Sequence, residues 1–349
     1  MRVHTRLLLA ALAALSLPGV GRAQAVPAGG APGGPSPFAI TPGDPDIPAD
    51  PARFDLSDKP HPLGLDHDDR MTMEVRIGDV GPYDFVIDTG SQRTIVAREL
   101  AQRLALPELP PVEIVSMAGR VTVGAVRLGG LRFGDHSIGA LDALSIAHTD
   151  LGSAGLIGLD SLKNKRLTLD FKKRRMDIGQ SRRVAPTNDP DTIVVRARSR
   201  MGQLILVDSR IDGRKVNVIL DTGAELSVGN MALFRSLKLQ RLLVPPQPTV
   251  LTSVTGVAVP AQFTVVRHIT IGSVTLDNVP MVFLDAAPFD ELELGDKPAM
   301  LLGMRMLRLF DKVAIDFGNR QVDFHLGERA ALADGDRFAA LGALGAARR

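Results

Sequence analysis

The chain has 349 residues, 45% of them hydrophobic, which is enough for two or three domains with a sizeable core. Its 41 lysine and arginine residues nearly balance its 39 aspartate and glutamate residues, so its charge gives no reason to expect a nucleic acid or an anionic membrane as a partner. Cysteine is absent, which excludes disulfides, thiol chemistry and a lipid anchor on cysteine.

The N-terminus has the form of a secretory signal peptide. Arg2 and Arg6 precede an eleven-residue run of Leu, Ala and Ser at 7–17, and a small-residue cleavage site follows at 23–25. The apolar run is too short to span a membrane. An uncleaved interfacial anchor is the alternative, and the well-placed cleavage site argues against it. We therefore predict a signal peptide over 1–25 and a periplasmic or secreted protein without a membrane anchor after cleavage.

A segment rich in proline and glycine follows the leader. Residues 26 to about 66 hold ten of the 24 prolines, a composition typical of an unpacked tether. We predict a disordered linker over 26–69, with a removable prosegment as the other interpretation. The histidines and aspartates at 61–69 lack the spacing of a metal site, so no metal ligand is predicted.

From residue 70 the chain reads as short β strands separated by glycines. Residues 70–180 are predicted to form a first β-rich lobe, 181–192 a polar linker, 193–326 a second lobe, and 327–349 a C-terminal tail. Within the first lobe we predict a strand at 83–87, a strand end and short helix at 95–104, and a hairpin at 113–126 that turns at Ala118-Gly119.

The second lobe repeats this order. It has a strand and short helix at 227–237, a hairpin at 252–263 with Thr255-Gly256 at its middle, and a long buried strand at 276–284. The acidic stretch 285–297 is predicted to be an insertion without a counterpart in the first lobe.

Each repeat places an aspartate directly after an apolar strand. Val86-Ile87-Asp88-Thr89-Gly90 recurs as Ile219-Leu220-Asp221-Thr222-Gly223, with 221 − 88 = 133 residues between the aspartates. A lone carboxylate at the end of a buried strand is costly. Two such strands related by a pseudo-twofold axis would place the carboxyls side by side, where they can share one proton and hold a water molecule.

A second motif follows each aspartate. Leu156-Ile157-Gly158 leads into a predicted short helix at 159–162, and Leu301-Leu302-Gly303 leads into one at 304–307. The glycines lie 158 − 88 = 70 and 303 − 221 = 82 residues beyond their aspartates. Matching strands at 167–171 and 313–317 close the two halves. Over about residues 70–326 this doubled pattern resembles the retropepsin-like (retroviral-type) aspartic peptidases, here as two repeats in one chain.

The resemblance implies an all-β, bilobal fold of the retropepsin or pepsin type, with two pseudo-symmetric β-barrel-like lobes and short helices. It implies an aspartic endopeptidase that hydrolyses polypeptide substrates without a cofactor, with Asp88 and Asp221 as the catalytic pair. Which aspartate carries the shared proton stays open, because that is a property of the pair. Viral-type enzymes need two chains that each supply one aspartate. Both lie on one chain here, so we expect a monomer with an intramolecular pseudo-dimer.

Neighbouring residues are predicted to support the active-site loops. Gly90 and Gly223 should let the backbone turn sharply and bring its N–H groups close to the carboxylates. By resemblance, Thr89 and Thr222 should hydrogen-bond across the pseudo-twofold axis.

The two active-site loops are not expected to be equivalent. Ser91 is expected to hydrogen-bond its own aspartate, which Ala224 cannot do. Gly119 and Gly256 lie where the family has flaps, which close over an extended substrate and pair with it as an added strand.

Two other functions are compatible with parts of this pattern. A catalytically inactive peptide-binding module with the same fold is the main alternative, and a structural or interaction domain is the third. Two intact Asp-Thr-Gly triplets argue against the inactive module, and a structural domain has no evident use for paired buried carboxylates. The motifs of zinc proteases, serine hydrolases and P-loop nucleotide-binding proteins are absent from the sequence.

Overall fold

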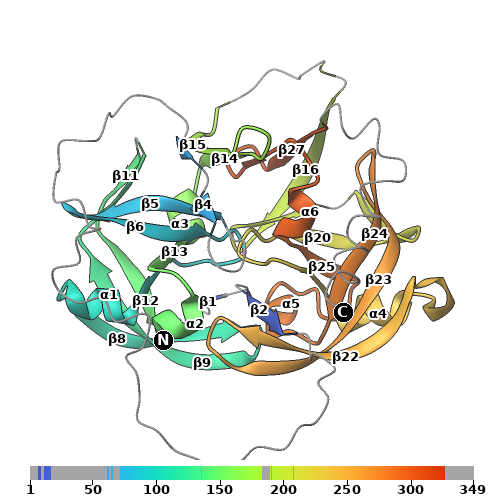
Figure 1. Cartoon of the computed structure of the whole chain (residues 1–349), viewed down its shortest axis with the longest axis horizontal. Helices are drawn as coiled ribbons and strands as arrows, with labels where there is room; N and C mark the ends of the chain where they lie inside the picture. The colour runs from blue at the N-terminus through green and yellow to red at the C-terminus, as the bar shows by residue number, and fades with distance from the viewer. Residues whose placement is uncertain are drawn as a thin grey trace, which may run out of the picture.

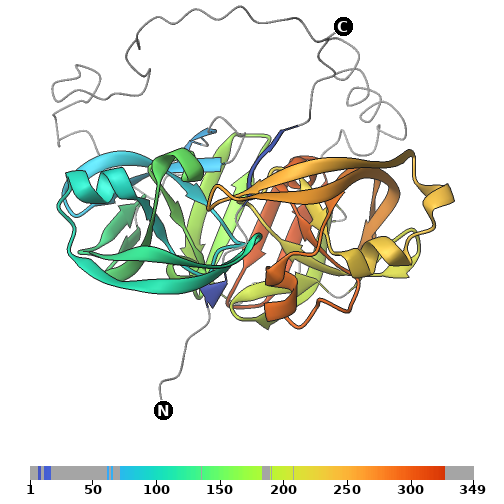
Figure 2. The same ribbon diagram turned by 90° about the horizontal axis from the view of Figure 1, so that it is seen from below.

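The computed structural model describes residues 71–326, except 135, 183–188, 190 and 207, together with the backbone of short strands before residue 66. These are β1 (Leu7–Leu8), β2 (Leu12–Ser16), β3 (His61–Pro62) and β4 (Gly64–Leu65). The rest of the predicted leader 1–25 and linker 26–69, and the predicted tail 327–349, lie outside the described residues. The described chain is mostly β and forms two sheet-rich lobes side by side (Figures 1 and 2), as predicted.

The first lobe contains a sheet whose strands run from residue 71 to 157, with short helices at its edges. Its strands are β5 (Met71–Ile77), β6 (Val80–Ile87), β7 (Ile95–Ala97), β8 (Glu108–Ser116), β9 (Gly119–Leu128), β10 (Leu131–Phe133), β11 (His136–Ile138), β12 (Leu141–Ile146) and β13 (Gly155–Ile157). Its helices are α1 (Arg98–Arg103), α2 (His148–Leu151) and α3 (Leu159–Leu162). The predicted strand and helix at 95–104, the hairpin and the helix at 159–162 are therefore confirmed.

The second lobe repeats this order with longer strands. Its strands are β16 (Thr192–Arg200), β17 (Gln203–Leu206), β18 (Ser209–Ile211), β19 (Arg214–Lys215), β20 (Asn217–Leu220), β21 (Ser227–Gly229), β22 (Val244–Ser253), β23 (Ala258–Ile271), β24 (Val274–Phe283) and β25 (Ala299–Leu302). Its helices are α4 (Met231–Ser236), the 3-10 helix η2 (Leu239–Arg241), α5 (Ala287–Glu291) and α6 (Met304–Leu307).

The acidic stretch 285–297 has a partial counterpart in the first lobe, so the prediction of none was wrong, although the connection 284–298 is longer than its equivalent 147–154. Helix α5 lies between β24 and β25 just as α2 lies between β12 and β13. Both helices carry the chain from the end of one strand back to the start of the next. The two helices differ in length and in most of their residues, so their equivalence is visible only in the fold.

Strand register explains the spacing of the doubled motifs. In the first lobe β6 and β13 are parallel, with Ile87 opposite Ile157; in the second, β20 and β25 are parallel, with Leu220 opposite Leu302. The pairing continues to the aspartates, because the Asp88 N–H donates to the Ile157 carbonyl at 3.0 Å and the Asp221 N–H to the Leu302 carbonyl at 3.1 Å. Each Asp-Thr-Gly loop therefore lies beside the second motif of its own repeat.

A sheet between the lobes joins the two repeats. It contains β14 (Lys165–Asp170) and β15 (Arg175–Gln180) from the first repeat and β26 (Lys312–Asp316) and β27 (Gln321–His325) from the second. β14 pairs antiparallel with β26, with Leu167 opposite Ile315, so the two matching closing strands lie next to each other. β16 continues this sheet into the second lobe, because it pairs first with β27 and then with β17.

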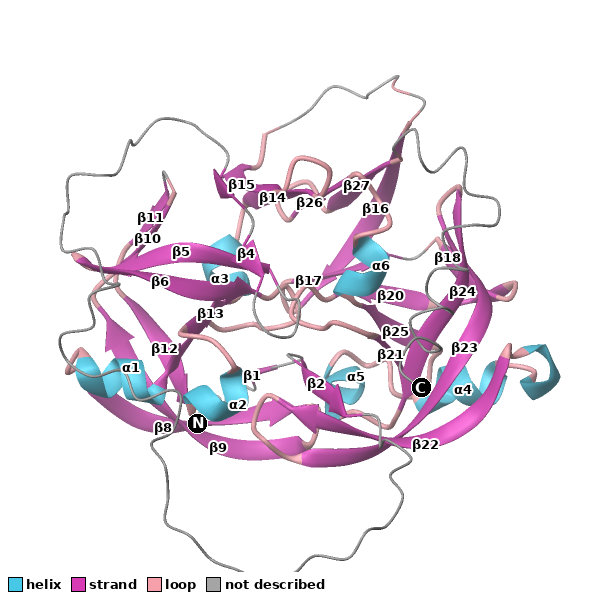
Figure 3. Ribbon diagram, viewed as in Figure 1, coloured by secondary structure: helices cyan, strands magenta, loops and turns pink. Residues whose placement is uncertain are grey.

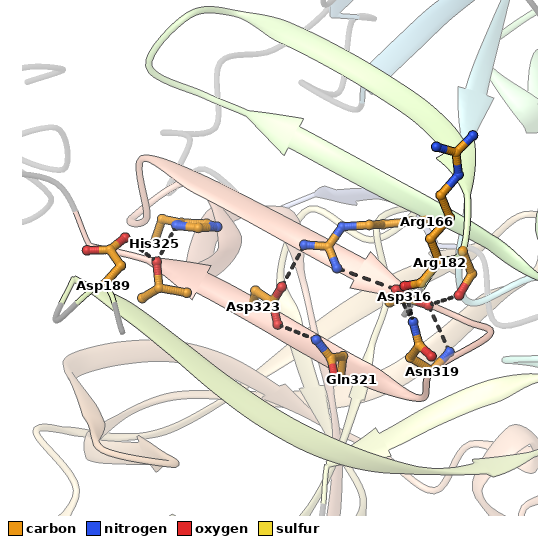
Figure 4. Close-up of polar contacts among 10 residues, drawn as sticks. Arg166, Arg182, Asp189, Asp316, Asn319, Gln321, Asp323 and His325 are labelled. Carbon is orange, nitrogen blue, oxygen red and sulfur yellow. Dashed lines mark hydrogen bonds and ion pairs between the residues drawn. The ribbon is translucent and has the colours of Figure 1, made fainter. Parts of the chain in front are cut away.

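Charged side chains cross this sheet between the repeats (Figure 4). Arg166 of β14 contacts Asp316 at 3.4 Å and Asp323 at 2.6 Å. Asp316 is buried and also accepts hydrogen bonds from the Ser181 hydroxyl at 2.5 Å and the Asn319 N–H at 2.8 Å. Burial by itself raises the pKa of Asp316, but these hydrogen bonds and the charge of Arg166 outweigh it and hold the pKa below its usual value.

The apolar core is continuous from one lobe through the joining sheet to the other. It is built mostly from Val, Leu, Ile and Met, as a chain with 4% aromatic residues requires. Among the described residues, no helix is long and apolar enough to cross a membrane.

Candidate active site

The structure brings the two predicted aspartates together at the junction of the lobes. Asp88 follows β6 and Asp221 follows β20, and both side chains are fully buried. The Gly90 N–H donates to Asp88 Oδ1 at 2.7 Å, and the Gly223 N–H donates to Asp221 Oδ1 at 3.0 Å. Each carboxyl is thus held by the loop that carries it.

Gly90 and Gly223 are required by space as well as by these hydrogen bonds. A Cβ atom on Gly90 would lie 2.7 Å from the carboxyl carbon of Asp221, and one on Gly223 would lie 2.3 Å from that of Asp88. Neither glycine has a left-handed φ, so conformational freedom is not what selects them. Each glycine instead admits the carboxyl of the opposite lobe, and the two carboxyls approach crosswise.

The two threonines link the loops across the pseudo-twofold axis, as predicted. The Thr89 N–H donates to Thr222 Oγ1 and the Thr222 N–H to Thr89 Oγ1, both at 3.1 Å. Each hydroxyl then donates to a backbone carbonyl of the other repeat, Thr89 to Leu220 at 2.8 Å and Thr222 to Ile87 at 2.6 Å. These four buried hydrogen bonds fix the distance between the carboxyls.

Ser91 supports Asp88 through its backbone, not through its hydroxyl, so the expected side-chain asymmetry was wrong. Its N–H donates to Asp88 Oδ1 at 3.1 Å, while its hydroxyl donates to the Arg93 carbonyl at 2.8 Å. The Ala224 N–H likewise stabilises the Asp221 carboxylate. A backbone donor serves at both positions, so serine and alanine offer their carboxylates the same hydrogen bond.

The electrostatics of the pair favour a shared proton. Burial raises the pKa of Asp221 well above its usual value, and the charge of Asp88 and a hydrogen bond with its carboxyl raise it further. The N–H groups of Gly223 and Ala224 oppose the shift without cancelling it. One proton is therefore retained by the pair at a pH where an isolated aspartate would be ionised.

A buried glutamine at this site was missed in the sequence. Gln203, the first residue of β17, donates its amide N–H to the Gly90 carbonyl at 2.7 Å, and its Oε1 is buried without a hydrogen-bond partner among the described residues. It links the second lobe to the active-site loop of the first. In the sequence Gln203 stands out only as a polar residue directly before the apolar run 204–206, and that position does not indicate that it hydrogen-bonds to Gly90.

Gly119 and Gly256 lie at the turns of two hairpins. The first hairpin is β8–β9 and the second is β22–β23. The backbones of Gly119 and Gly256 have φ of +108° and +75°, a region that favours glycine over other residues. Both hairpins run along the lower edge of the molecule in Figure 1.

The N-terminal strands pair with these hairpins. β1 runs parallel to β8, with Leu7 opposite Ile114, and β2 runs antiparallel to β22, with Ser16 opposite Val250. The edges of β8 and β22 that face the body of the molecule can therefore each accept an added extended strand (Figure 1).

Within the described residues, no group of three or more histidine, aspartate or glutamate side chains lies close enough to hold a metal ion.

Comparison with known proteins follows the two repeats. A family model described as aspartyl protease matches residues 73–161 and again 207–306. The crystal structure of a retropepsin-like aspartic protease from Rickettsia conorii is similar at 21% sequence identity and a TM-score of 0.26, over 39% of this chain and 90% of that one. No curated protein sequence matches the chain.

Proposed function

This chain belongs to the aspartyl protease family, and from that we propose that it is an aspartic endopeptidase that hydrolyses peptide bonds in polypeptides. The observation that carries the proposal is the crosswise contact of Asp88 and Asp221, buried at the ends of equivalent strands. No cofactor is part of this proposal.

The two carboxyls have complementary roles in the proposed reaction. The ionised member takes a proton from a water molecule, and the protonated member donates a hydrogen bond to the scissile carbonyl. The raised pKa of Asp221 supports a pair in which one carboxyl stays protonated. The threonine hydrogen bonds hold the carboxyls at a fixed separation during proton transfer.

An extended polypeptide is the substrate class that the hairpins support. β1 and β2 show that β8 and β22 have room and backbone donors for an added strand. A substrate strand bound there would lie between the hairpins and the body of the molecule, and backbone pairing would hold it largely independently of its side chains.

The test is cleavage of an unfolded protein by the purified chain, followed by mass spectrometry of the products. We expect internal cleavage that is lost on substitution of either aspartate. Binding of peptides without cleavage by the wild type would favour the inactive peptide-binding module instead.

We expect proteolytic activity to fall as pH rises. The pKa of Asp221 is raised, so the shared proton is lost at a higher pH than that of an isolated aspartate, and activity is lost through that upper apparent pKa. Stability should change in the same direction. Between the unfolded pKa of Asp221 and its raised folded pKa, the folded pair holds more protons than the unfolded chain, so the free energy of unfolding falls as pH rises through that window. Rates and urea midpoints between pH 3 and 8 measure both trends. A rate that climbs steadily with pH would contradict the assignment.

We propose that the monomer is the active unit. β14 and β26 pair within one chain and join the two lobes, and a covalent link gives the lobes an effective concentration on the order of millimolar for each other. Specific activity is therefore expected to be unchanged on dilution. Mixing Asp88→Asn with Asp221→Asn is the sharper measurement. Recovery of activity that rises with protein concentration would indicate a domain-swapped dimer and contradict the monomer.

We also propose that the protein is exported, to the periplasm in a bacterial cell. The predicted signal peptide 1–25 supports this. Cell fractionation and N-terminal sequencing of the exported protein test it, and they also decide whether 26–69 is a linker or a prosegment.

A further inference from the structure

Each hairpin tip has apolar side chains that are buried against the opposite lobe. Val115 and Met117 of the first hairpin are buried in an apolar cluster whose other described members all come from the second lobe, including Phe289 of α5. Conversely, Val254 of the second hairpin is buried in a cluster whose other described members all come from the first lobe, including Leu151 of α2. We call the surface of the opposite lobe that contacts each hairpin tip its seat. The equivalent helices α2 and α5 each contribute to one seat, and Figure 3 shows both helices above the hairpins.

The two seats differ in charge. Arg120 of the first hairpin forms an ion pair with Glu291 at the end of α5, with 2.5 Å between Nη2 and Oε1. Only 14% of the Glu291 side chain is exposed, against 43% of the Arg120 side chain, so solvent screens the carboxylate less than it screens the guanidinium. On the other side, a Cβ atom on Gly256 would lie 2.8 Å from a carboxyl oxygen of Asp150 in α2. The second hairpin therefore packs its backbone against a carboxylate and places no cation there.

Arg120 also contacts Glu113 within its own hairpin at 3.2 Å, but 61% of that glutamate side chain is exposed. The contact with Glu291 is shorter and more buried, and it crosses from one lobe to the other. Helix α5 packs against both β8 and β9. The ion pair and the Met117 contact therefore act on the same tip and oppose its separation from the second lobe.

We infer that Arg120 and Glu291 form a latch that holds the tip of the first hairpin against the second lobe, and that they are positioning residues for the proposed peptidase. Because the second hairpin has no equivalent ion pair among the described contacts, the latch makes opening asymmetric: the second hairpin opens more readily and the first stays seated. Only the expected effect of the latch on catalysis rests on the proposed function. The latch itself is a property of the unliganded fold.

Hydrogen exchange without substrate tests the latch independently of catalysis. In an Asp88→Asn background, which prevents self-cleavage, Arg120→Ala and Glu291→Ala are each expected to speed amide exchange at 113–122 by about three- to tenfold, the scale of one partly buried ion pair. Exchange at 248–260 should change by less than about twofold. The double variant should be no faster than either single variant, since both remove the same interaction.

Two matched controls separate the latch from a general loss of charge. Arg127 lies on the same strand β9 and pairs at 2.5 Å with Asp142 of its own lobe, so Arg127→Ala removes an equally short ion pair that does not cross the lobes. Glu113→Ala removes the other partner of Arg120. Both are expected to leave exchange at 113–122 within about twofold of the parent, as for exposed pairs. Glu291→Gln keeps the shape of the side chain should Glu291→Ala disturb α5.

Steady-state kinetics in the wild-type background give the catalytic readout. Loss of the latch is expected to lower kcat/KM by about three- to tenfold, chiefly through KM, because the closed hairpin holds the substrate while the carboxyls are unchanged. The proposal is overturned if Glu291→Gln and Arg120→Ala leave exchange at 113–122 as slow as Arg127→Ala does. Faster exchange in a chain that shows no turnover would support the latch while contradicting the proposed function.

Discussion

Replacement of either active-site aspartate is expected to lower peptide-bond turnover by about 10³-fold or more, the scale of losing an acid–base partner. Asp88→Asn and Asp221→Asn each remove one carboxyl of a pair in which one member must accept a proton while the other donates a hydrogen bond. The remaining carboxyl cannot perform both roles. Turnover of an unfolded protein substrate, measured at the pH of maximal wild-type activity, gives the ratio.

The loss should occur without unfolding. Both side chains are buried close to each other, so an asparagine of nearly equal size removes charge repulsion and keeps the packing. We expect an unchanged circular dichroism spectrum and a free energy of unfolding equal to or above that of the wild type. Asp79→Asn, at a fully exposed aspartate, is the matched control and should retain full activity. Near-wild-type turnover by either active-site variant with a folded spectrum would disprove the pair.

Arg166→Ala is expected to lower the free energy of unfolding by about 3 kcal/mol, the lower end of the range for breaking a buried ion pair. Arg166 is 22% exposed, but its partner Asp316 is fully buried and Asp323 nearly so. Removing the arginine leaves both carboxylates in the sheet between the lobes without their shared cation (Figure 4). Urea unfolding monitored by circular dichroism measures the loss.

The matched control is an ion pair at the end of β14 and β26, in the same sheet between the lobes. Lys172 pairs with Asp311 at 3.4 Å, and 63% of the lysine side chain is exposed, so Lys172→Ala should cost less than about 1 kcal/mol. A similar small loss for Arg166→Ala would show that water replaces the guanidinium and that the network contributes little to joining the repeats.

Acid should weaken this network while leaving the active-site pair protonated. The pKa of Asp316 is lowered in the folded chain, so its contribution to stability is present above its unfolded pKa and is lost as pH falls through the folded value. The raised pKa of Asp221 acts in the opposite direction. The pH of greatest stability is therefore expected between the lowered pKa of Asp316 and the raised pKa of Asp221.

Local patterns in the chain were sufficient to predict the elements of the repeats. Apolar strands ending at Asp88 and Asp221, the glycine-led helices at 159–162 and 304–307, and the hairpins around Gly119 and Gly256 all form at the predicted places. These features depend on periodicity and on turn residues within a few positions of each other. Because the motifs occur twice, the sequence also predicted that a pseudo-twofold axis relates the two lobes.

Contacts between the repeats could not be predicted in this way. The hydrogen bond from Gln203 to Gly90, the hairpin tips seated against α2 and α5, and the Arg120–Glu291 ion pair each join residues more than a hundred positions apart. A single polar or apolar residue carries no local mark of such a partner.

Ser91 and the two glycines show the same limit on a smaller scale. The type of residue suggested a side-chain hydrogen bond for Ser91 and a sharp turn for Gly90 and Gly223. Folding instead placed a backbone N–H of Ser91 at the carboxylate and the opposite lobe's carboxyl against each glycine. The amino-acid sequence thus determines which groups are available and where strands end. The packing of one lobe on the other decides which atoms they meet, because that distance is set by the whole fold and not by neighbours along the chain.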